Sequence, residues 1–320
     1  MAVRGGTGLS RQFDVLVAGD LFVDLILGGF TEWPGAGTEV FAKEYRRDVG
    51  GGAAITACGL ARLGSDASVL SVVGHDTGNW VTERLAGFGV DTSELRFHDT
   101  EPTAFSVGVS TAQDRTFLTY QGANRRFPEV LAETAKSGGL RRTRHIHLGW
   151  APPLETAAGL MAAIRANGCT ISLDTGWHEA WLADEQAMEL LREVDIFFPN
   201  ELEALRMTGE QDPERSLRAY ETAGARRVVL KLGATGAAML WDGEIFHAEP
   251  CRVTPVDTIG AGDAFDAGFL HYWLRGEAPP TCLQAANICG ALSTEAYGGV
   301  AGFPDAARVQ ELLKDSLCEK

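Results

Sequence analysis

The sequence predicts an α/β fold of three layers, in which helices cover both faces of a largely parallel sheet and a small β structure stands apart. Two observations lead to this prediction. Short apolar, β-rich runs alternate with longer helical stretches along most of the chain, as in βαβ units. In the first third, Glu39–Arg47 and Thr103–Tyr120 instead alternate in side-chain character, as half-exposed antiparallel strands do.

The strands predicted for the parallel sheet are Asp14–Gly19, Ser68–Val73, Ile146–Leu148, Thr170–Leu173, Ile196–Phe198 and Val228–Leu232. The predicted helices are Ala53–Leu63, Thr77–Phe88, Leu154–Asn167, Glu179–Arg192, Glu201–Met207, Ala261–Trp273 and Leu283–Tyr297. Gly64, Gly89 and Gly168 stand just past three of these helices, where glycine commonly ends a helix. Two hairpin turns are expected, one at Gln113-Asp114 and a type I′ turn at Asp242-Gly243 within Ala237–Ala248.

At 320 residues, the chain is long for one domain and short for two. We therefore expect one main domain over residues 13–318, into which two segments of the small β structure, about 37–49 and 101–122, are inserted. Residues 1–12 are polar and predict a flexible tail.

Acidic residues outnumber basic ones by 43 to 28, which gives a formal net charge of −15. Nucleic acids and anionic membrane surfaces are therefore not expected partners. No window approaches the roughly 18 uninterrupted apolar residues of a spanning helix, and the first residues lack an apolar signal core. The six cysteines form no C-x-x-C pair, so reduced thiols are expected. Together these features predict a cytoplasmic protein.

The most informative stretch is Asp257-Thr258-Ile259-Gly260-Ala261-Gly262-Asp263, which leads into an apolar helix. Free amides and the helix dipole make such a helix start an anion site suited to phosphate. Asp263 nevertheless adds a negative charge there. The conflict is resolved if Asp263 takes the proton of an attacking hydroxyl, while the amides of Gly260, Ala261 and Gly262 receive the charge of the transferred phosphoryl group. The alternative is a simple helix cap.

This seven-residue string resembles the ribokinase family, the phosphofructokinase-B type of carbohydrate kinase. A second feature of that family is the run Gly50-Gly51-Gly52-Ala53-Ala54 leading into a helix that ends Ala61-Arg62-Leu63-Gly64. The resemblance extends from about Asp14 to Pro304. It implies a ribokinase-like fold in which the small β structure is a lid, and ATP-dependent phosphorylation of a hydroxyl of a sugar or sugar-like molecule.

By the same resemblance, Asp24 would hold hydroxyls of the acceptor from the end of the first strand. Gly50 and Gly51 would let the backbone approach the acceptor or act as a lid hinge, although a tight helix entry explains them nearly as well. Many relatives have an Asn at the position of Ile55, and ribose-type enzymes have one at the position of Phe22. These changes leave the identity of the sugar open.

Several residues are implied at the nucleotide, namely Asn200, Lys231, Gly233, Gly236 and Asn287. Glu203 would act on Mg²⁺ through water, although Asn200 and Glu203 also have the spacing of a capping box. The resembling enzymes often bind a monovalent cation such as K⁺, for which Asp257, Ile259 and the loop 298–302 are candidates. A homodimer formed through the lid is left open.

The motif Asp-Pro-Asn-x-Arg of the family is replaced here by Asp174-Thr175-Gly176-Trp177-His178, so Trp177 and His178 are only candidate site residues. His145 and His147 share one face of a predicted strand, which favours a core position. Two alternatives to a sugar kinase stay open. The apolar Phe22 and Ile55, which could face a base, would suit a nucleoside kinase of the same family. A non-catalytic sugar or nucleotide sensor is the other alternative, against which the intact Asp263 argues.

Overall fold

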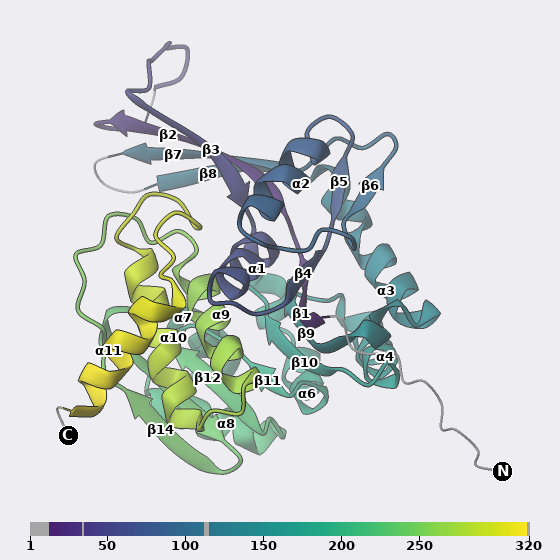
Figure 1. Ribbon diagram of the computed structural model, residues 1–320, viewed down its shortest axis with the longest axis vertical. Coiled ribbons are helices and arrows are strands. Elements are labelled where there is room, and N and C mark those ends of the chain that lie inside the picture. Colours follow the sequence, from purple (N-terminus) through teal and green to yellow (C-terminus); the bar gives the residue numbers. More distant parts are fainter. Residues whose placement is uncertain (1–12, 34, 112–114, 319–320) are drawn as a thin grey trace.

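The structure, a computed structural model, describes residues 13–33, 35–111 and 115–318, and in this part an eight-stranded sheet forms the middle layer (Figure 1). Its strands are β1 (Phe13–Gly19), β4 (Ala67–Leu70), β9 (Thr143–Gly149), β10 (Thr170–Asp174), β11 (Ile196–Phe197), β12 (Arg227–Lys231), β13 (Ala237–Trp241) and β14 (Glu244–Ala248). Their order is β14-β13-β12-β11-β10-β9-β1-β4. The six neighbouring strands β12, β11, β10, β9, β1 and β4 pair in parallel. Strands β13 and β14 add an antiparallel edge.

Helices cover both faces of this sheet, as predicted. One face carries α1 (Gly52–Arg62), α2 (Gly78–Gly87), α9 (Ala261–Leu274), α10 (Pro279–Ser293) and α11 (Ala306–Cys318). The other carries α3 (Phe127–Ser137), α4 (Leu154–Ala166), α5 (Glu179–Leu182), α6 (Glu185–Leu190), α7 (Glu201–Thr208) and α8 (Pro213–Ala223). Side chains alternate between the faces, so that Val15 and Val17 of β1 enter one core and Leu16 and Ala18 the other.

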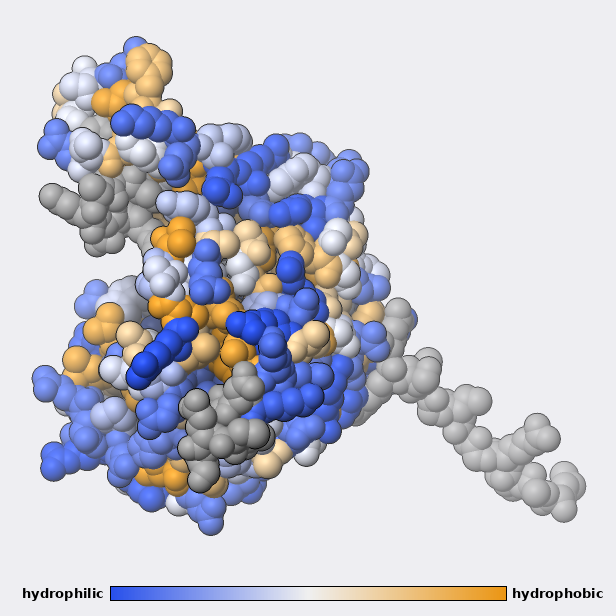
Figure 2. All heavy atoms as spheres, turned by 60° about the vertical axis from the view of Figure 1, so that its left-hand side comes forward, coloured by the Kyte–Doolittle hydropathy of each residue, from blue (hydrophilic) through white to orange (hydrophobic). Residues whose placement is uncertain are grey.

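A second sheet of four strands projects from the body in the order β3-β2-β7-β8 (Figure 1). Its strands are β2 (Phe22–Phe30), β3 (Glu44–Gly50), β7 (Phe105–Thr111) and β8 (Arg115–Tyr120). We call it the lid sheet. In Figure 2 it forms a separate lobe, and the surface is hollowed between that lobe and the body. Strands β3, β7 and β8 fall in or beside the segments 37–49 and 101–122, whereas β2 was not predicted.

Some predicted boundaries are wrong. The predicted strand Ser68–Val73 is two strands, because β5 (Val72–Gly74) pairs with β6 (Arg96–His98) in a small third sheet. The predicted helix Glu179–Arg192 is broken where the Asp184 side chain accepts a hydrogen bond from Gln186 N–H and starts α6. The last predicted helix, Leu283–Tyr297, begins and ends earlier, at Pro279 and Ser293. Helices α3, α8 and α11 were not predicted.

The turn at Asp242-Gly243 is confirmed, since both residues have positive φ between β13 and β14. The expected tail, residues 1–12, and the expected turn at Gln113-Asp114 lie outside the described residues. In the described part of the chain, no helix is long and apolar enough to cross a membrane.

Candidate active site

The predicted site residues gather at one edge of the main sheet, where the parallel strands end. Strand β1 ends at Gly19, β10 at Asp174 and β12 at Lys231, and these carboxyl ends point the same way because the strands are parallel. Helix α9 also begins at this edge. A Cβ placed on its second residue, Gly262, would lie 3.5 Å from the Nζ atom of Lys231. Sheets of this kind bind ligands at the carboxyl ends of their strands.

The start of α9 offers open backbone amides. Gly260 has φ of 72°, a left-handed conformation that favours glycine and turns the chain into the helix. In the described part of the chain, the amides of Gly260 and Gly262 have no hydrogen-bond partner. Ala261 N–H donates to the carbonyl of Thr258 at 3.3 Å, so it can join the predicted anion hole only by giving up that bond.

Asp263 stands in the first turn of α9, half-buried. Its Oδ1 lies 3.0 Å from the point where a Cβ would stand on Gly52, the first residue of α1. Burial raises the pKa of Asp263 from 3.8 to about 7, and the negative charge of Asp174 adds to the rise. A carboxylate with such a pKa can accept a proton near neutral pH.

Asp24 lies in the lid sheet, on β2, and not at the end of the first strand as predicted. Its carboxylate covers Gly50, at the end of β3. Burial, together with the nearby charge of Asp48, raises the pKa of Asp24 to about 7. Asp48 itself is held by Arg84 through two hydrogen bonds of 2.7 and 2.8 Å. Gly50, Gly51 and Gly52 thus run from Asp24 to Asp263.

Gly50→Ala tests this placement. The added methyl group would occupy the space of the Asp24 carboxylate, which can rotate away because it is the end of a side chain. We expect kcat/KM for the acceptor to fall by roughly 10²-fold, the loss of hydrogen bonds to a buried carboxylate, with the KM for ATP and the Tm little changed. Gly159→Ala in α4 is the control, since nothing lies within 4 Å of its added Cβ. An unchanged acceptor kcat/KM in Gly50→Ala would place the acceptor elsewhere.

Ile55 was predicted to touch the acceptor, and the structure gives it a packing contact. It is buried on α1, and its side chain lies 3.0 Å from the Cβ position of Gly260 and against Gly299. Ile55 therefore supports the turn into α9 and the loop beside it. Contact with an acceptor stays a prediction.

Lys231, predicted at the nucleotide, is held by two carboxylates. Its Nζ lies 2.6 Å from Asp174 Oδ2 and 3.3 Å from Asp266 Oδ1. Burial alone would raise the pKa of Asp174, but the ammonium group lowers it to about 2. The two carboxylates in turn hold the pKa of Lys231 above its usual range against the effect of burial. A Cβ on Gly262 would lie 3.5 Å from Nζ, so this ammonium group faces the start of α9.

Asp266 stands one turn after Asp263 on α9 and is fully buried. Burial raises its pKa well above 3.8. Among the described residues its Oδ2 has no hydrogen-bond partner, and it lies 3.9 Å from His147 Nε2. His147 and His145 both bond to the hydroxyl of Ser172, at 2.8 and 2.7 Å. The two histidines are core residues, as predicted.

Asn200 and Glu203 form the capping box at the start of α7. Glu203 N–H donates to Asn200 Oδ1 at 2.9 Å, and Asn200 N–H donates to Glu203 Oε2 at 2.8 Å. The Asn200 amide also donates to Glu203 Oε1. Burial raises the pKa of Glu203 to about 7, with a further contribution from the charge of Asp174. Both oxygens of Glu203 thus accept hydrogen bonds from Asn200, and a role of Glu203 at a metal ion stays a prediction.

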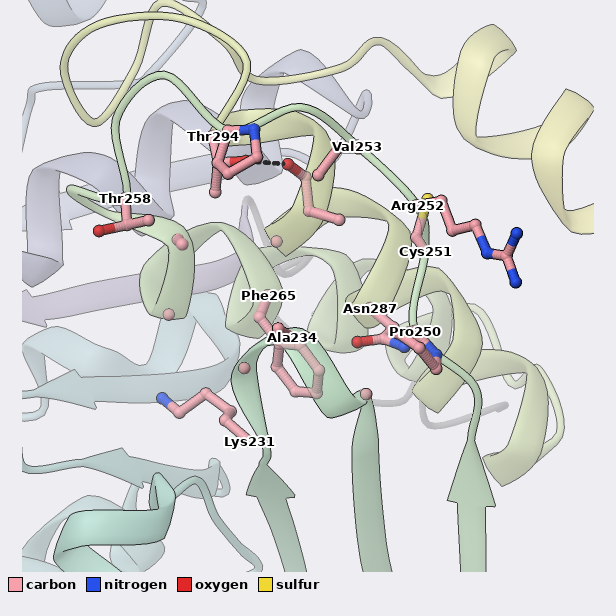
Figure 3. A pocket seen from close by; sticks show the side chains of 17 residues that line it. Lys231, Ala234, Pro250, Cys251, Arg252, Val253, Thr258, Phe265, Asn287 and Thr294 are labelled. Carbon is pink, nitrogen blue, oxygen red and sulfur yellow. Dashed lines mark hydrogen bonds between the residues drawn. The ribbon is translucent and has the colours of Figure 1, made fainter.

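A cavity of about 710 Å³ opens beside the start of α9 (Figure 3). Its walls come from the loop after β12, the segment 250–258, and helices α9 and α10. Among the lining residues are the predicted Lys231, Gly233, Gly236, Ala261, Gly262 and Asn287. Figure 3 shows Lys231 at one end of the cavity and Asn287 with Pro250 on the opposite side of Phe265. This volume suits a ligand the size of a nucleotide.

Asp257 is buried at the other side of the turn. Its two carboxylate oxygens accept hydrogen bonds from Ile259 N–H and Gly298 N–H, each at 2.9 Å. Asp257 therefore ties together the two segments predicted to surround a monovalent cation. In the described residues, no group of three or more His, Cys, Asp or Glu side chains could hold a metal ion.

Trp177 and His178 follow β10 at the same sheet edge. Trp177 is 59% exposed, and His178 Nδ1 accepts a hydrogen bond from Trp181 N–H at the start of α5. The residues that the sequence analysis missed are Asp174 and Asp266. Each had a signal. Asp174 directly follows the predicted strand Thr170–Leu173, and Asp266 follows Asp263 by three positions, which puts both carboxylates on one side of a helix.

Comparison with known proteins gives the family of this chain. Residues 12–306 match the model of the pfkB family carbohydrate kinases. A 2-dehydro-3-deoxygluconokinase of Bacillus subtilis is 30% identical over 84% of this chain and 87% of its own length. An ATP-dependent ribose-1-phosphate kinase of Halopiger xanaduensis is 31% identical over 94% of this chain and 98% of its own.

A nucleoside kinase of Methanothermobacter thermautotrophicus is 29% identical over 93% of this chain and 94% of its own. Among solved structures, Arabidopsis thaliana ribokinase complexed with ribose and ATP is similar with a TM-score of 0.79 and 26% identity, over 94% of this chain and 99% of that one.

Proposed function

The chain belongs to the pfkB family of carbohydrate kinases, and on this premise we propose that it transfers the γ-phosphoryl group of ATP to a hydroxyl of a sugar or sugar-like molecule, with Asp263 as general base. The family makes it a sugar or nucleoside kinase, a phosphotransferase. The observation that carries the proposal is the place of Asp263. It lies between the cavity lined by Gly262 and the Gly50–Gly52 segment that leads to Asp24.

The geometry supports a direct displacement. Asp24 holds hydroxyls of the acceptor, and Asp263 takes the proton of the reacting hydroxyl. The hydroxyl oxygen then bonds to the γ-phosphorus as the bond to ADP breaks. The amides of Gly260 and Gly262, joined by Ala261 once its bond to Thr258 is released, stabilise the charge on the transferred group together with Lys231.

ATP is proposed to occupy the 710 Å³ cavity, with its phosphates toward Lys231 and the start of α9 and its base toward Asn287. The backbone at Gly233 and Gly236 would lie against the nucleotide. Asn287 already donates its amide to the carbonyl of Glu249, so it is positioned in the wall before any nucleotide binds.

Two metal ions belong to the proposal. Mg²⁺, when bound with ATP, would neutralise part of the charge of the terminal phosphates. Asn200 and Glu203 would hold it through water, with the Glu203 carboxylate kept in place by two hydrogen bonds from Asn200. K⁺ would be held by carbonyl groups of the two segments that Asp257 connects.

A nucleoside is the second candidate acceptor. The half-buried Phe22 lies beside Gly51, where its ring is 3.0 Å from the Cβ position of that glycine, and the exposed Trp177 offers a second aromatic face. Either ring could stack on a base. A sensor without catalysis is less well supported, because Asp263, Asp24 and the cavity are arranged together. A homodimer through the lid sheet stays a prediction.

The experiment is an ADP-release assay with purified protein, ATP and Mg²⁺ over a panel of ketoses, aldoses, sugar acids, sugar phosphates and nucleosides. We expect acceptor-dependent ADP formation with at least one sugar or sugar derivative and much slower release with water alone. A nucleoside as the best acceptor would favour the second candidate. ADP release that no acceptor stimulates would refute the kinase proposal.

A further inference from the structure

The two faces of the lid sheet carry different arginines. In the antiparallel pairing of β2 with β3, Asp24 is opposite Asp48 and Ile26 is opposite Arg46, so Asp24 and Arg46 lie on one face. Arg47 is opposite Leu25, on the other face. On that other face, the guanidinium carbon of Arg47 lies 4.0 Å from the ring centroid of Trp80 of α2.

Arg46 points instead toward the active-site side. Its guanidinium carbon lies 5.0 Å from the ring centroid of Tyr297, in the loop after α10. That loop borders the start of α9, since Gly299 Cα is 2.8 Å from the Cβ position of Gly260. Arg46 therefore connects the face of the lid that carries Asp24 with the rim of the proposed anion hole.

No carboxylate pairs with Arg46 in the part of the chain that the structure describes. By contrast, Arg84 forms a two-pronged ion pair with Asp48 on the same strand. Stacking on Tyr297 covers one face of the guanidinium group and leaves its N–H edges open to a planar or tetrahedral anion.

Asp263, Asp24 and Arg46 follow one another along the backbone of the lid strands and the glycine segment. Asp263 lies at Gly52, and Asp24 lies at Gly50. Arg46 is two residues beyond the Asp24–Asp48 pair, about 7 Å further along the strand. An acceptor aligned with this strip would place its reacting hydroxyl at Asp263, further hydroxyls at Asp24, and its other end at Arg46.

We propose that the acceptor carries a phosphate or carboxylate group and that Arg46 binds it, so that Arg46 determines specificity for an anionic sugar derivative. This inference rests on the proposed kinase function. It predicts that the protein prefers sugar phosphates or sugar acids to neutral sugars and nucleosides as acceptors. The Asp24 carboxylate would repel an anionic group of the acceptor that came close to it. The separation of Arg46 from Asp24 along the strand keeps these two negative charges apart.

The test compares matched acceptors: D-fructose, D-fructose 6-phosphate, 2-dehydro-3-deoxygluconate, D-ribose, ribose 1-phosphate and adenosine. We expect wild type to use a phosphate or carboxylate acceptor best. Arg46→Gln should lower kcat/KM for that acceptor by about 10- to 100-fold, the loss of charge-assisted hydrogen bonds. The KM for ATP and the kcat/KM for neutral sugars should stay unchanged, and Arg46→Lys should recover part of the loss.

Arg47→Gln is the matched control, because it removes a neighbouring stacked arginine from the opposite face and should affect all acceptors equally and little. The acceptor with the highest kcat/KM shows whether the site binds a phosphate or a carboxylate group. Preference for a neutral sugar or nucleoside, or an equal loss for all acceptors in Arg46→Gln, would overturn the inference and leave the kinase function standing. If no member of the panel is phosphorylated, both are refuted.

Discussion

Asp263→Asn is expected to lower kcat by roughly 10²- to 10⁴-fold, the range seen when a general base is lost. The amide keeps the size of the carboxyl group but cannot take the proton of the acceptor hydroxyl. The KM for ATP should change little, because the nucleotide cavity is lined by other residues. Rapid-quench measurement of phosphoryl transfer at saturating ATP and acceptor checks this.

The control is the stability of the Asp263→Asn protein compared with that of wild type. Burial raises the pKa of Asp263 to about 7, so its ionised form opposes folding. Folded Asp263 holds its proton more tightly than unfolded Asp263, and stability contributed by this group therefore falls as pH rises from about 4 to about 7. Asp263→Asn should be at least as stable as wild type at pH 8. Wild-type turnover in a stable variant would remove Asp263 from the mechanism.

The same pKa predicts how the wild-type kcat/KM for the acceptor responds to pH, because kcat/KM reports the pKa of the free enzyme. The base must be ionised, so kcat/KM should rise about tenfold per pH unit below about 7 and level off above it. Asp24 also has a raised pKa, so the profile is repeated with Asp24→Asn, which should keep the acid limb. A kcat/KM that is flat from pH 5 to 8 would contradict the assignment.

Lys231→Met is expected to reduce the free energy of unfolding at pH 8 by about 3 kcal/mol, because it leaves the ionised carboxylate of Asp174 buried beside Asp266 without a cation. It should also raise the KM for ATP. Urea unfolding and ATP kinetics measure the two effects. Adding Asp174→Asn to the variant should restore part of the stability.

The control is Arg227→Met, at the other end of the same strand, where the partner Asp242 is solvent-accessible. Such an exposed pair should contribute less than about 1 kcal/mol. The pH dependence gives a second check. Lys231 lowers the pKa of Asp174 to about 2, so the pair stabilises wild type above about pH 4 and this stability is lost as pH falls toward 2. Lys231→Met should lack that acid loss, and equal losses in both variants would refute the buried triad.

The sequence predicted the main sheet well because each parallel strand is a short apolar run. Strand β2 escaped prediction because Asp24 and Gly28-Gly29 interrupt its apolar pattern, and its partners are distant in sequence. Helix α8 could have been predicted, since Asp212 caps it and Pro213 stands at its first position, an established start signal. Helix α8 was not predicted because few of its residues are apolar.

At the site, local motifs located Asp263, Gly260 and the capping box of Asn200 with Glu203. The triad of Lys231 with Asp174 and Asp266 could not be derived from spacing, because the three residues come from two strands and a helix that only the tertiary fold brings together. The open arginine of the lid, Arg46, likewise depended on strand register, which sequence patterns leave undetermined.

The central claim is that the γ-phosphoryl group of ATP is transferred to a hydroxyl of a small acceptor at Asp263. The most direct measurement is ³¹P NMR of a complete reaction with ATP, Mg²⁺ and the best acceptor of the panel. The account predicts a new phosphate monoester signal that grows in step with ADP and is almost absent with Asp263→Asn. Inorganic phosphate as the main product, or the same monoester rate in the variant, would contradict it.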